Sequence, residues 1–226
     1  ISHNKVTGFS INVPIAWTCQ PTKVCIKECY FAKGHNTWSG ALNHQAKVYG
    51  LVKDDPNKFA QKVIREYDNH GLSFLRWNGG GDLFKESVEA INIIGKERPD
   101  IVLWVVTRIG KWASLIDEYP NVFIHFSIDE SSRRKMVSYT QSEKKSENYF
   151  FSYQASPGEV LTDEKIKDIS ILFFDDYQIY QEQKPQLINE TVMCDLNKYE
   201  SIENVCENCR KCFDGTAVNY TKTKIS

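Results

Sequence analysis

Cysteine is missing from the whole middle of this sequence, since none lies between Cys29 and Cys194. All seven cysteines are confined to two groups near the ends of the chain. Their odd number, and the lack of a signal peptide's apolar core in residues 1–5, favour a reducing compartment over a disulfide framework. In such a compartment, grouped cysteines indicate metal binding or redox chemistry.

Long apolar runs and an excess of charge are also missing. No stretch approaches the ~18 consecutive apolar residues that a membrane span requires. The 28 basic and 29 acidic residues give a net charge of −1, so the sequence lacks the basic face on which nucleic-acid affinity depends. We therefore expect a cytoplasmic protein that binds neither membranes nor nucleic acid.

The composition is that of a folded protein of ordinary size. Of the 226 residues, 41% are hydrophobic and 12% aromatic, which is enough for a proper core and excludes disorder or a fibrous repeat. A polar linker begins at residue 181, where the character of the chain changes. We expect one domain over residues 1–180 and a cysteine-rich segment packed on it over residues 181–226.

Short apolar stretches alternate with helical stretches along residues 1–180, which predicts βαβ units and a parallel sheet. The predicted strands cover residues 9–13, 73–77, 101–106, 122–127, 149–153 and 170–174. The predicted helices cover about 41–52, 56–69, 86–97 and 111–119, with a helical turn at 162–167 and a short helix plus a loop within 131–148.

Such a set of strands is compatible with an open doubly wound sheet or with an incomplete (β/α) barrel. The strands end in small or polar residues, including Thr107-Arg108, Ser127 and Asp129. Barrels gather their functional groups at the carboxyl ends of their strands, so we predict an α/β fold with an incomplete TIM-type barrel of about six parallel strands. A buried ion pair would explain Arg108 and Asp129 nearly as well.

The carboxyl-terminal cysteines form the stronger motif. The run reads Cys206-Glu-Asn-Cys209-Arg-Lys-Cys212-Phe213, and Cys194 precedes it. Three thiolates on one tight loop, with a fourth nearby, are typical of iron–sulfur clusters. Zinc also accepts four thiolates, but zinc sites favour two separate Cys-x2-Cys pairs. We expect an iron–sulfur site and keep zinc as the alternative metal.

The amino-terminal cysteines follow the first predicted strand directly. Cys19, Cys25 and Cys29 offer three thiolates, which would leave one iron of a four-iron cluster open for a further ligand. His35 is the nearest histidine, and His44 and His125 are further candidates. The two cysteine groups would hold two clusters, or ligands from both would share one.

A glycine-rich turn follows the second predicted strand. Gly79, Gly80 and Gly81 allow a ligand or another backbone to approach closely, and Asp82 offers an acceptor for an amine or a hydroxyl. No Gly-Lys-Ser/Thr follows, so this is not a phosphate-binding loop of the P-loop kind. We predict that these four residues bind a cofactor; the alternative is a tight strand-to-helix turn.

Three cysteines after a first strand and a Gly-Gly-acid turn after the second resemble radical S-adenosylmethionine enzymes. Those enzymes hold a [4Fe–4S] cluster with three cysteines and the methionyl amine near a Gly-Gly-Glu turn. Cys25 and Cys29 match the first gap of their cysteine motif. Ala32 stands where the third cysteine would be, and Asp82 replaces the glutamate.

The sequence also resembles the gene product 88 family of phages over residues 8–215. The resemblance rests on Cys19, Cys25 and Cys29-Tyr30-Phe31-Ala32, on Gly81-Asp82-Leu83-Phe84, on Val106-Thr107-Arg108, and on the tail from Cys194 to Phe213. It implies a phage-encoded iron–sulfur protein on a radical-enzyme-like partial barrel, located in the cytoplasm of an infected cell.

These patterns together predict a [4Fe–4S] protein with a redox, electron-transfer or radical role, an unidentified redox partner and an unidentified substrate. S-Adenosylmethionine is a possible second cofactor through the resemblance to radical enzymes. The competing hypothesis is a zinc-stabilised binding module without redox activity. The sequence does not decide whether the protein is an enzyme.

Overall fold

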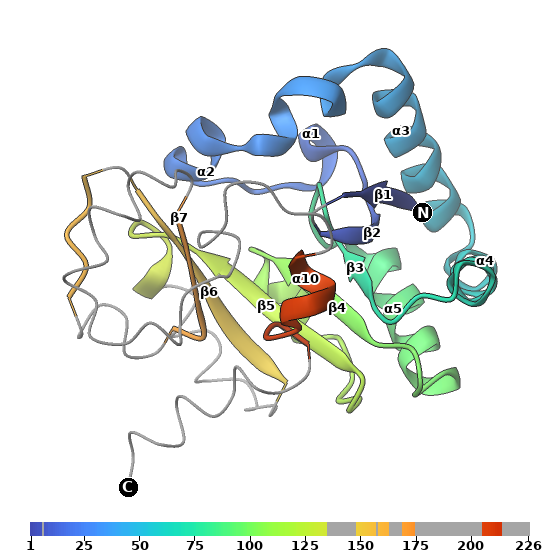
Figure 1. Cartoon of the computed structure of the whole chain (residues 1–226). Coiled ribbons are helices and arrows are strands. Elements are labelled where there is room, and N and C mark those ends of the chain that lie inside the picture. The colour runs from blue at the N-terminus through green and yellow to red at the C-terminus, as the bar shows by residue number, and fades with distance from the viewer. Residues whose placement is uncertain (6, 135–147, 157, 163–168, 175–204, 214–226) are drawn as a thin grey trace, which may run out of the picture.

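A seven-stranded sheet forms the centre of the molecule in the computed structural model, which describes residues 1–5, 7–134, 148–156, 158–162, 169–174 and 205–213 (Figure 1). The strands are β1 (Ser2–Asn4), β2 (Gly8–Ile11), β3 (Leu75–Trp77), β4 (Leu103–Thr107), β5 (Val122–Ile128), β6 (Tyr149–Ala155) and β7 (Ile171–Phe174).

The strands lie in the sheet in the order in which they occur along the chain. β1 pairs with β2 in the antiparallel sense, and every later pair, from β2–β3 to β6–β7, is parallel. Parallel neighbours need a crossover connection, which the helices between the strands provide. The predicted α/β fold with six parallel strands is therefore confirmed. Among the described strands, β1 and β7 are the two edges of the sheet.

The helices of the described residues are α1 (Ile15–Thr18), α2 (Lys23–Glu28), α3 (Ser39–Asp54), α4 (Pro56–His70), α5 (Lys85–Glu97), α6 (Gly110–Ala113) and α10 (Val205–Cys209), with 3₁₀ turns η1 (Tyr30–Ala32) and η2 (Gly34–Thr37). None of them is long and apolar enough to cross a membrane.

Helix α4 begins and ends where its sequence predicts. The Asp55 carboxylate accepts a hydrogen bond from the Lys58 amide at 2.8 Å, and Pro56 occupies the first turn, where its missing N–H costs nothing. Gly71 ends the helix in the left-handed conformation, with φ of 57°. Helix α3 starts two residues before its predicted position, at Ser39.

Several elements are shorter than the sequence predicts, and for β2 and α6 another segment takes over the backbone groups. β2 ends at Ile11 because the Val13 amide donates to the Gly80 carbonyl at 3.0 Å rather than to a strand. α6 ends at Ala113 because Asn92 of α5 bonds to the Leu115 carbonyl and to the Asp117 amide. The predicted helical turn at 162–167 and most of the region 131–148 lie outside the described residues.

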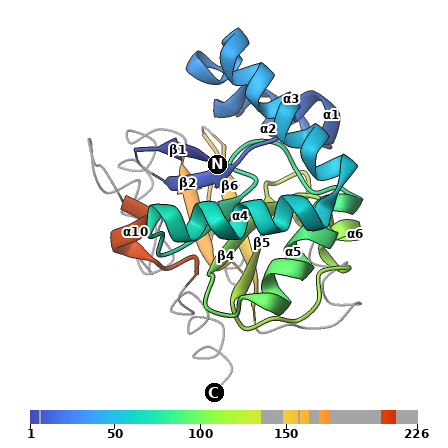
Figure 2. The ribbon, with the colours of Figure 1, turned by 90° about the vertical axis from the view of Figure 1, so that its right-hand side faces the viewer.

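The sheet has two faces of different character. One face carries an apolar row, including Trp77, Val105 and Ile124, which are adjacent across β3, β4 and β5. Helices α4 and α5 cover this face with buried side chains such as Val63 and Ile91, and Figure 2 shows both helices lying across the strands. This is the main hydrophobic core.

The opposite face is partly covered by the carboxyl-terminal segment 205–213. Ser10, Arg76, Trp104 and Phe123 are paired neighbours across β2 to β5 and therefore share this face. The Phe213 ring stacks on Phe74, with 4.1 Å between centroids, and also contacts Trp104. Figures 1 and 2 both place α10 on the side of the sheet away from α4 and α5.

Candidate metal site and polar pocket

The first cysteine group (Cys19, Cys25 and Cys29) lies on the connection that leaves β2. Cys19 ends helix α1 and its amide donates to the Ile15 carbonyl at 3.1 Å. Cys25 lies within α2, whose amino terminus is capped by Thr22: the hydroxyl oxygen accepts from the Cys25 amide at 3.1 Å. Cys29 ends the same helix.

Three hydrogen bonds hold this connection against the carboxyl ends of the parallel strands. The Thr22 hydroxyl donates to the Asp129 carboxylate just after β5, and the Tyr30 hydroxyl donates to the Gly79 carbonyl just after β3. The Thr18 hydroxyl oxygen accepts from the Asp82 amide at 3.0 Å. The three cysteines are therefore fixed over the end of the sheet where α/β proteins carry their functional groups.

The thiols of the first cysteine group lie close enough to influence one another. Burial raises the pKa of Cys19 to about 12, and the negative charges of Asp82, Cys25 and Cys29 add to this effect. Burial also raises the pKa of Cys25, while the Arg108 guanidinium opposes the rise. Without a bound cation the raised pKa values keep the Cys19 and Cys25 thiols protonated at neutral pH, and a cation beside them would favour the thiolate form.

Asp82 is buried beneath the cysteines and accepts several hydrogen bonds. The Thr107 hydroxyl donates to it at 2.5 Å, the Leu83 amide at 2.7 Å and the Arg108 amide at 3.0 Å. Burial raises the pKa of the Asp82 carboxyl to about 6, and these three bonds limit the rise. Asp82 is thus already engaged by the protein, and its predicted role in holding a cofactor stays a prediction.

Arg108 and Asp129 form a buried ion pair beside Asp82. The guanidinium lies 2.9 Å from the carboxylate, and the two side chains are 12% and 0% exposed. Burial would raise the pKa of Asp129, but hydrogen bonds from Ser131 and Thr22, together with the charge of Arg108, outweigh it and hold the pKa low. Arg108 lowers the pKa of Cys25 and Asp129 raises it, so the two charges of the pair act on this thiol in opposite senses.

The glycine turn after β3 is packed tightly against other parts of the chain. A Cβ on Gly79 would lie 2.4 Å from Asn12, and a Cβ on Gly80 would lie 2.2 Å from the Phe31 ring. Gly81 has φ of +87° and lies against Val13. The close approach that these glycines permit is made by β2 and the cysteine connection. Their predicted cofactor role is neither supported nor opposed by these contacts.

The second cysteine group lies elsewhere on the sheet. Cys206 and Cys212 pack with Phe74, Trp104 and Phe213, whereas the first group lies over the strand ends. Burial raises the pKa of Cys206 to about 11; Arg76 opposes this rise and Cys209 adds to it. Cys194 lies outside the described residues. In Figure 1, helix α2 of the first group and helix α10 of the second group lie in separate places.

His125 attaches the second cysteine group to β5. Its Nε2 lies 2.8 Å from the Cys212 carbonyl oxygen, and its Nδ1 lies 2.7 Å from the Ser152 hydroxyl. A carbonyl only accepts, so Nε2 carries the proton and the Ser152 hydroxyl donates to Nδ1. Burial lowers the pKa of this histidine to about 4. Both ring nitrogens are occupied, which makes His125 an anchor rather than a metal ligand.

His35 lies on the turn η2, where its ring packs edge-on against Trp38 with 4.2 Å between centroids. His35 also lines a pocket that adjoins Tyr30 of the cysteine connection. Within the described parts of the chain, no three His, Cys, Asp or Glu side chains are arranged to surround one metal ion.

The polar pocket, as we name this cavity of about 230 Å³, extends from Tyr30 to Arg76 on β3. Its other walls come from β1, from Ser10 and Asn12 at the end of β2, and from His44 of α3. No sequence pattern predicts this pocket, because its residues are distant along the chain and meet only through strand register and the position of α3.

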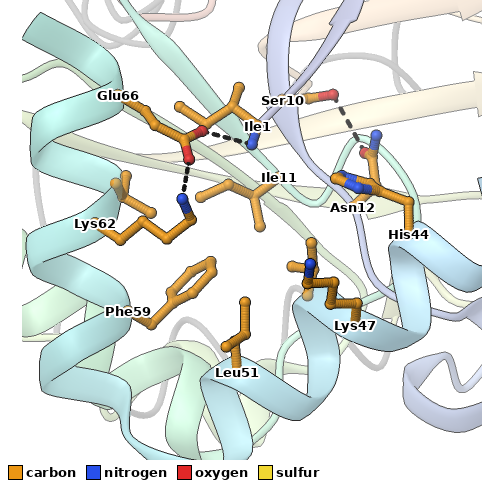
Figure 3. A pocket seen from close by; sticks show the side chains of 12 residues that line it. Ile1, Ser10, Ile11, Asn12, His44, Lys47, Leu51, Phe59, Lys62 and Glu66 are labelled. Atoms are coloured by element: carbon orange, nitrogen blue, oxygen red, sulfur yellow. Dashed lines mark hydrogen bonds and ion pairs between the residues drawn. The ribbon is translucent and has the colours of Figure 1, made fainter. Parts of the chain in front are cut away.

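A second cavity, of about 260 Å³, adjoins the polar pocket and shares Ser10, Asn12 and His44 with it. Figure 3 shows Lys47 of α3 and Lys62 of α4 in this neighbouring pocket, together with the apolar side chains of Leu51 and Phe59. Lys62 is paired with Glu66 at 2.6 Å. This pocket contains its own carboxylate, unlike the polar pocket.

Comparison with known families decides the relationship of this chain. The family model described as "Gene product 88" matches residues 2–215. The chain belongs to the gene product 88 family. No curated protein matches the sequence at a significant level. This membership confirms the family resemblance seen in the sequence; the iron–sulfur character that the resemblance implied remains a proposal.

Among solved structures, the chain is similar to an endo-beta-N-acetylglucosaminidase from Cordyceps militaris, solved in its apo form. The identity is 10%, the TM-score is 0.35, and the match covers 74% of this chain and 62% of that one. The chain thus spans less than two thirds of the length of that structure.

Proposed function

We propose that this gene product 88 protein, encoded by a phage, binds a [4Fe–4S] cluster through Cys19, Cys25 and Cys29 at the open end of an incomplete (β/α) barrel. The observation that carries the proposal is the convergence of the three thiols over the carboxyl ends of the parallel strands. There they act electrostatically on one another and on Asp82. Cysteines that only fill space in a hydrophobic core are not expected to gather at one end of a sheet in this way.

A single ion and a cluster make different demands on their ligands. A zinc ion takes its ligands on one centre, which requires them to surround one point. A four-iron cluster takes one cysteine on each of several irons, so its ligands lie farther apart. The mutual influence of the thiols shows that they are near one another, and the run of cysteines in the sequence is what favours the cluster in this proposal.

The surroundings of the thiols also suit a bound group with thiolate ligands. The Arg108 guanidinium favours the ionised form of Cys25, and its ion pair with Asp129 holds it in place. Thr22 and Tyr30 fix the two ends of the α2 region, which keeps the ligand-bearing backbone in position. When bound, an iron–sulfur cluster supplies one-electron redox chemistry.

We propose that the second group, Cys206, Cys209 and Cys212 with Cys194, holds a further cluster. Its burial beside Phe213 and Trp104 would shield such a cluster from water. The second group would then relay electrons between a redox partner and the first group. A shared cluster is less compatible with the separate places of α2 and α10 in the described residues.

The first group would leave one iron open, as in radical S-adenosylmethionine enzymes. Ala32 stands at the position of their third cysteine, and Asp82 is buried and already bonded by Thr107. We therefore expect weak cleavage of S-adenosylmethionine, or none, and propose electron transfer as the main role.

The test is to purify the full chain without oxygen and to measure iron, acid-labile sulfide and zinc per chain, with absorption spectra before and after reduction. We expect iron and sulfide in equal amounts and an absorption that bleaches on reduction. Triple serine variants of Cys19, Cys25 and Cys29, or of Cys206, Cys209 and Cys212, act as each other's control. Each should lose only its own share of the iron.

One zinc per chain without sulfide would overturn the proposal and support the zinc-stabilised module. Loss of all iron in either triple variant would point to one shared cluster. Incubation of the reduced protein with S-adenosylmethionine separates the two redox roles, since rapid release of 5′-deoxyadenosine would replace electron transfer with radical chemistry.

A further inference from the structure

The Arg76 side chain has no hydrogen bond and no counter-ion within the described residues. Its guanidinium lies over the Trp104 ring at 4.8 Å, and its Nε is buried without a hydrogen-bond partner in that part of the chain. A guanidinium carries five donors in a planar fork, so a half-buried arginine with an unpaired donor is costly unless a ligand pairs with it. Arg76 lines the polar pocket.

The polar pocket is lined by groups that suit a negative ligand. Among the described residues that line it there is no Asp or Glu, whereas Arg76 and three histidines, His3, His35 and His44, are present. An arginine held for structural reasons normally has a carboxylate beside it, as Arg108 has Asp129. The polar pocket provides positive and neutral donors without that partner.

Asn12 offers a further donor at the same place. Its side-chain oxygen accepts from the Ser10 hydroxyl at 3.2 Å and from the Gly80 amide at 2.9 Å. This use of the oxygen fixes the orientation of the amide, so the NH₂ group is the part of Asn12 that remains for a ligand. Asn12 directly follows β2, the parallel neighbour of the strand that carries Arg76, and both residues line the same cavity.

We infer that the polar pocket binds a small organic anion whose carboxylate or phosphate group pairs with the Arg76 guanidinium and accepts from the Asn12 amide. A carboxylate and a phosphate can each accept two parallel hydrogen bonds from the planar guanidinium of an arginine. The volume of about 230 Å³ limits the ligand to a few carbon atoms. This inference does not depend on the metal-site proposal, because no cysteine is among the described residues that line the pocket.

The first experiment measures binding of inorganic phosphate and, separately, of succinate to the full chain by isothermal titration calorimetry, at constant ionic strength with chloride as the background anion. Arg76→Met should weaken the binding of the preferred anion by about 10-fold or more, because it removes a charge-assisted bidentate contact. Arg76→Lys keeps the charge without the fork and should weaken it by a smaller factor. Comparison of the two probes distinguishes a phosphate ligand from a carboxylate.

Lys47→Met is the matched control, since it removes one positive charge from the neighbouring pocket and leaves the polar pocket intact (Figure 3). It should leave the affinity within about 2-fold, as expected for a screened charge. Thermal unfolding checks that each variant is folded, and Arg76→Lys carries the test if Arg76→Met does not fold.

Three results would overturn the inference: binding of neither anion, equal loss of affinity in Lys47→Met, or unchanged affinity in the Arg76 variants. The charge of Arg76 also acts on Cys206 and on His125. If Arg76→Met lowered the metal content while anion binding stayed unchanged, the arginine would instead be balancing the second cysteine group.

Discussion

Thr22 and Asp129, 107 residues apart in sequence, are joined by a hydrogen bond from the threonine hydroxyl to the carboxylate. The same threonine caps helix α2, which carries Cys25. Asp129 in turn holds Arg108. One side chain therefore ties the position of the first cysteine group to the end of β5.

Thr22→Val should remove both the cap and this tie. Loss of a helix cap costs about 1 kcal/mol, so we expect the free energy of unfolding to fall by roughly 1–2 kcal/mol in urea titrations. The iron retained per chain should also fall. Thr22→Ser keeps the hydroxyl and should resemble the wild type. Thr37→Val, whose hydroxyl only bonds to Gly34 on the exposed turn η2, is the control; equal iron loss there would refute the role of Thr22.

Arg108→Met should destabilise the fold strongly, because it leaves the buried carboxylate of Asp129 without its partner. Breaking such a pair typically costs about 3–5 kcal/mol. Adding Asp129→Asn removes the uncompensated charge and should recover part of the loss, which a double-mutant cycle in urea measures. If the double variant were less stable than Arg108→Met by the full cost of Asp129→Asn alone, the two side chains would not be coupled.

Asp82 should make stability depend on pH in a direction opposite to that of most carboxylates. Its pKa in the fold is raised to about 6 by burial, so its contribution is fully present below pH 4 and is lost as pH rises through 6. Relative to Asp82→Asn, the metal-free wild type should lose up to roughly 3 kcal/mol of unfolding free energy between pH 4 and pH 7.

Asp68 provides the control for that measurement. Its hydrogen bonds with Arg98 lower its pKa, so its contribution is present above the unfolded pKa and is lost as pH falls. The stability of Asp68→Asn relative to wild type should therefore change with pH in the opposite sense to that of Asp82→Asn. Parallel pH profiles for the two variants would contradict the assignment of a raised pKa to Asp82.

Gly80→Ala should force the glycine turn and the cysteine connection apart. The added Cβ would lie 2.2 Å from the Phe31 ring, and overpacking of this kind costs about 1–3 kcal/mol. Gly50→Ala is the matched control, since nothing lies within 4 Å of a Cβ there and helix α3 should gain up to about 1 kcal/mol. Thermal unfolding of both variants measures the difference; a neutral Gly80→Ala would show that Phe31 moves freely.

The features that the sequence predicted well are those set by neighbouring residues. The Asp55 cap, Pro56 and Gly71 define α4 because capping and left-handed turns depend on a few adjacent positions. The parallel sheet followed from the alternation of strands and helices. The buried ion pair that we gave as the alternative explanation of Arg108 and Asp129 is present, with 2.9 Å between the guanidinium and the carboxylate.

Features that depend on distant residues could not be predicted in the same way. Arg76 falls within the predicted strand 73–77, which carries no sign of a pocket. Its position at the pocket depends on the register of β3 with Ser10 and Trp104. Asn12 was predicted as strand, yet it bonds to the glycine turn instead. His125 was a candidate ligand, and only the fold shows that the Cys212 carbonyl occupies its Nε2.

The contact of Phe213 with Phe74 and Trp104 also sets an order of events during synthesis. On the ribosome, β3 and β4 emerge more than a hundred residues before the segment that covers them. At 5–20 residues per second, the nascent chain holds these two aromatic rings uncovered for on the order of ten seconds. During that interval the two rings lack their contact with Phe213, and truncation before residue 205 would remove this contact permanently.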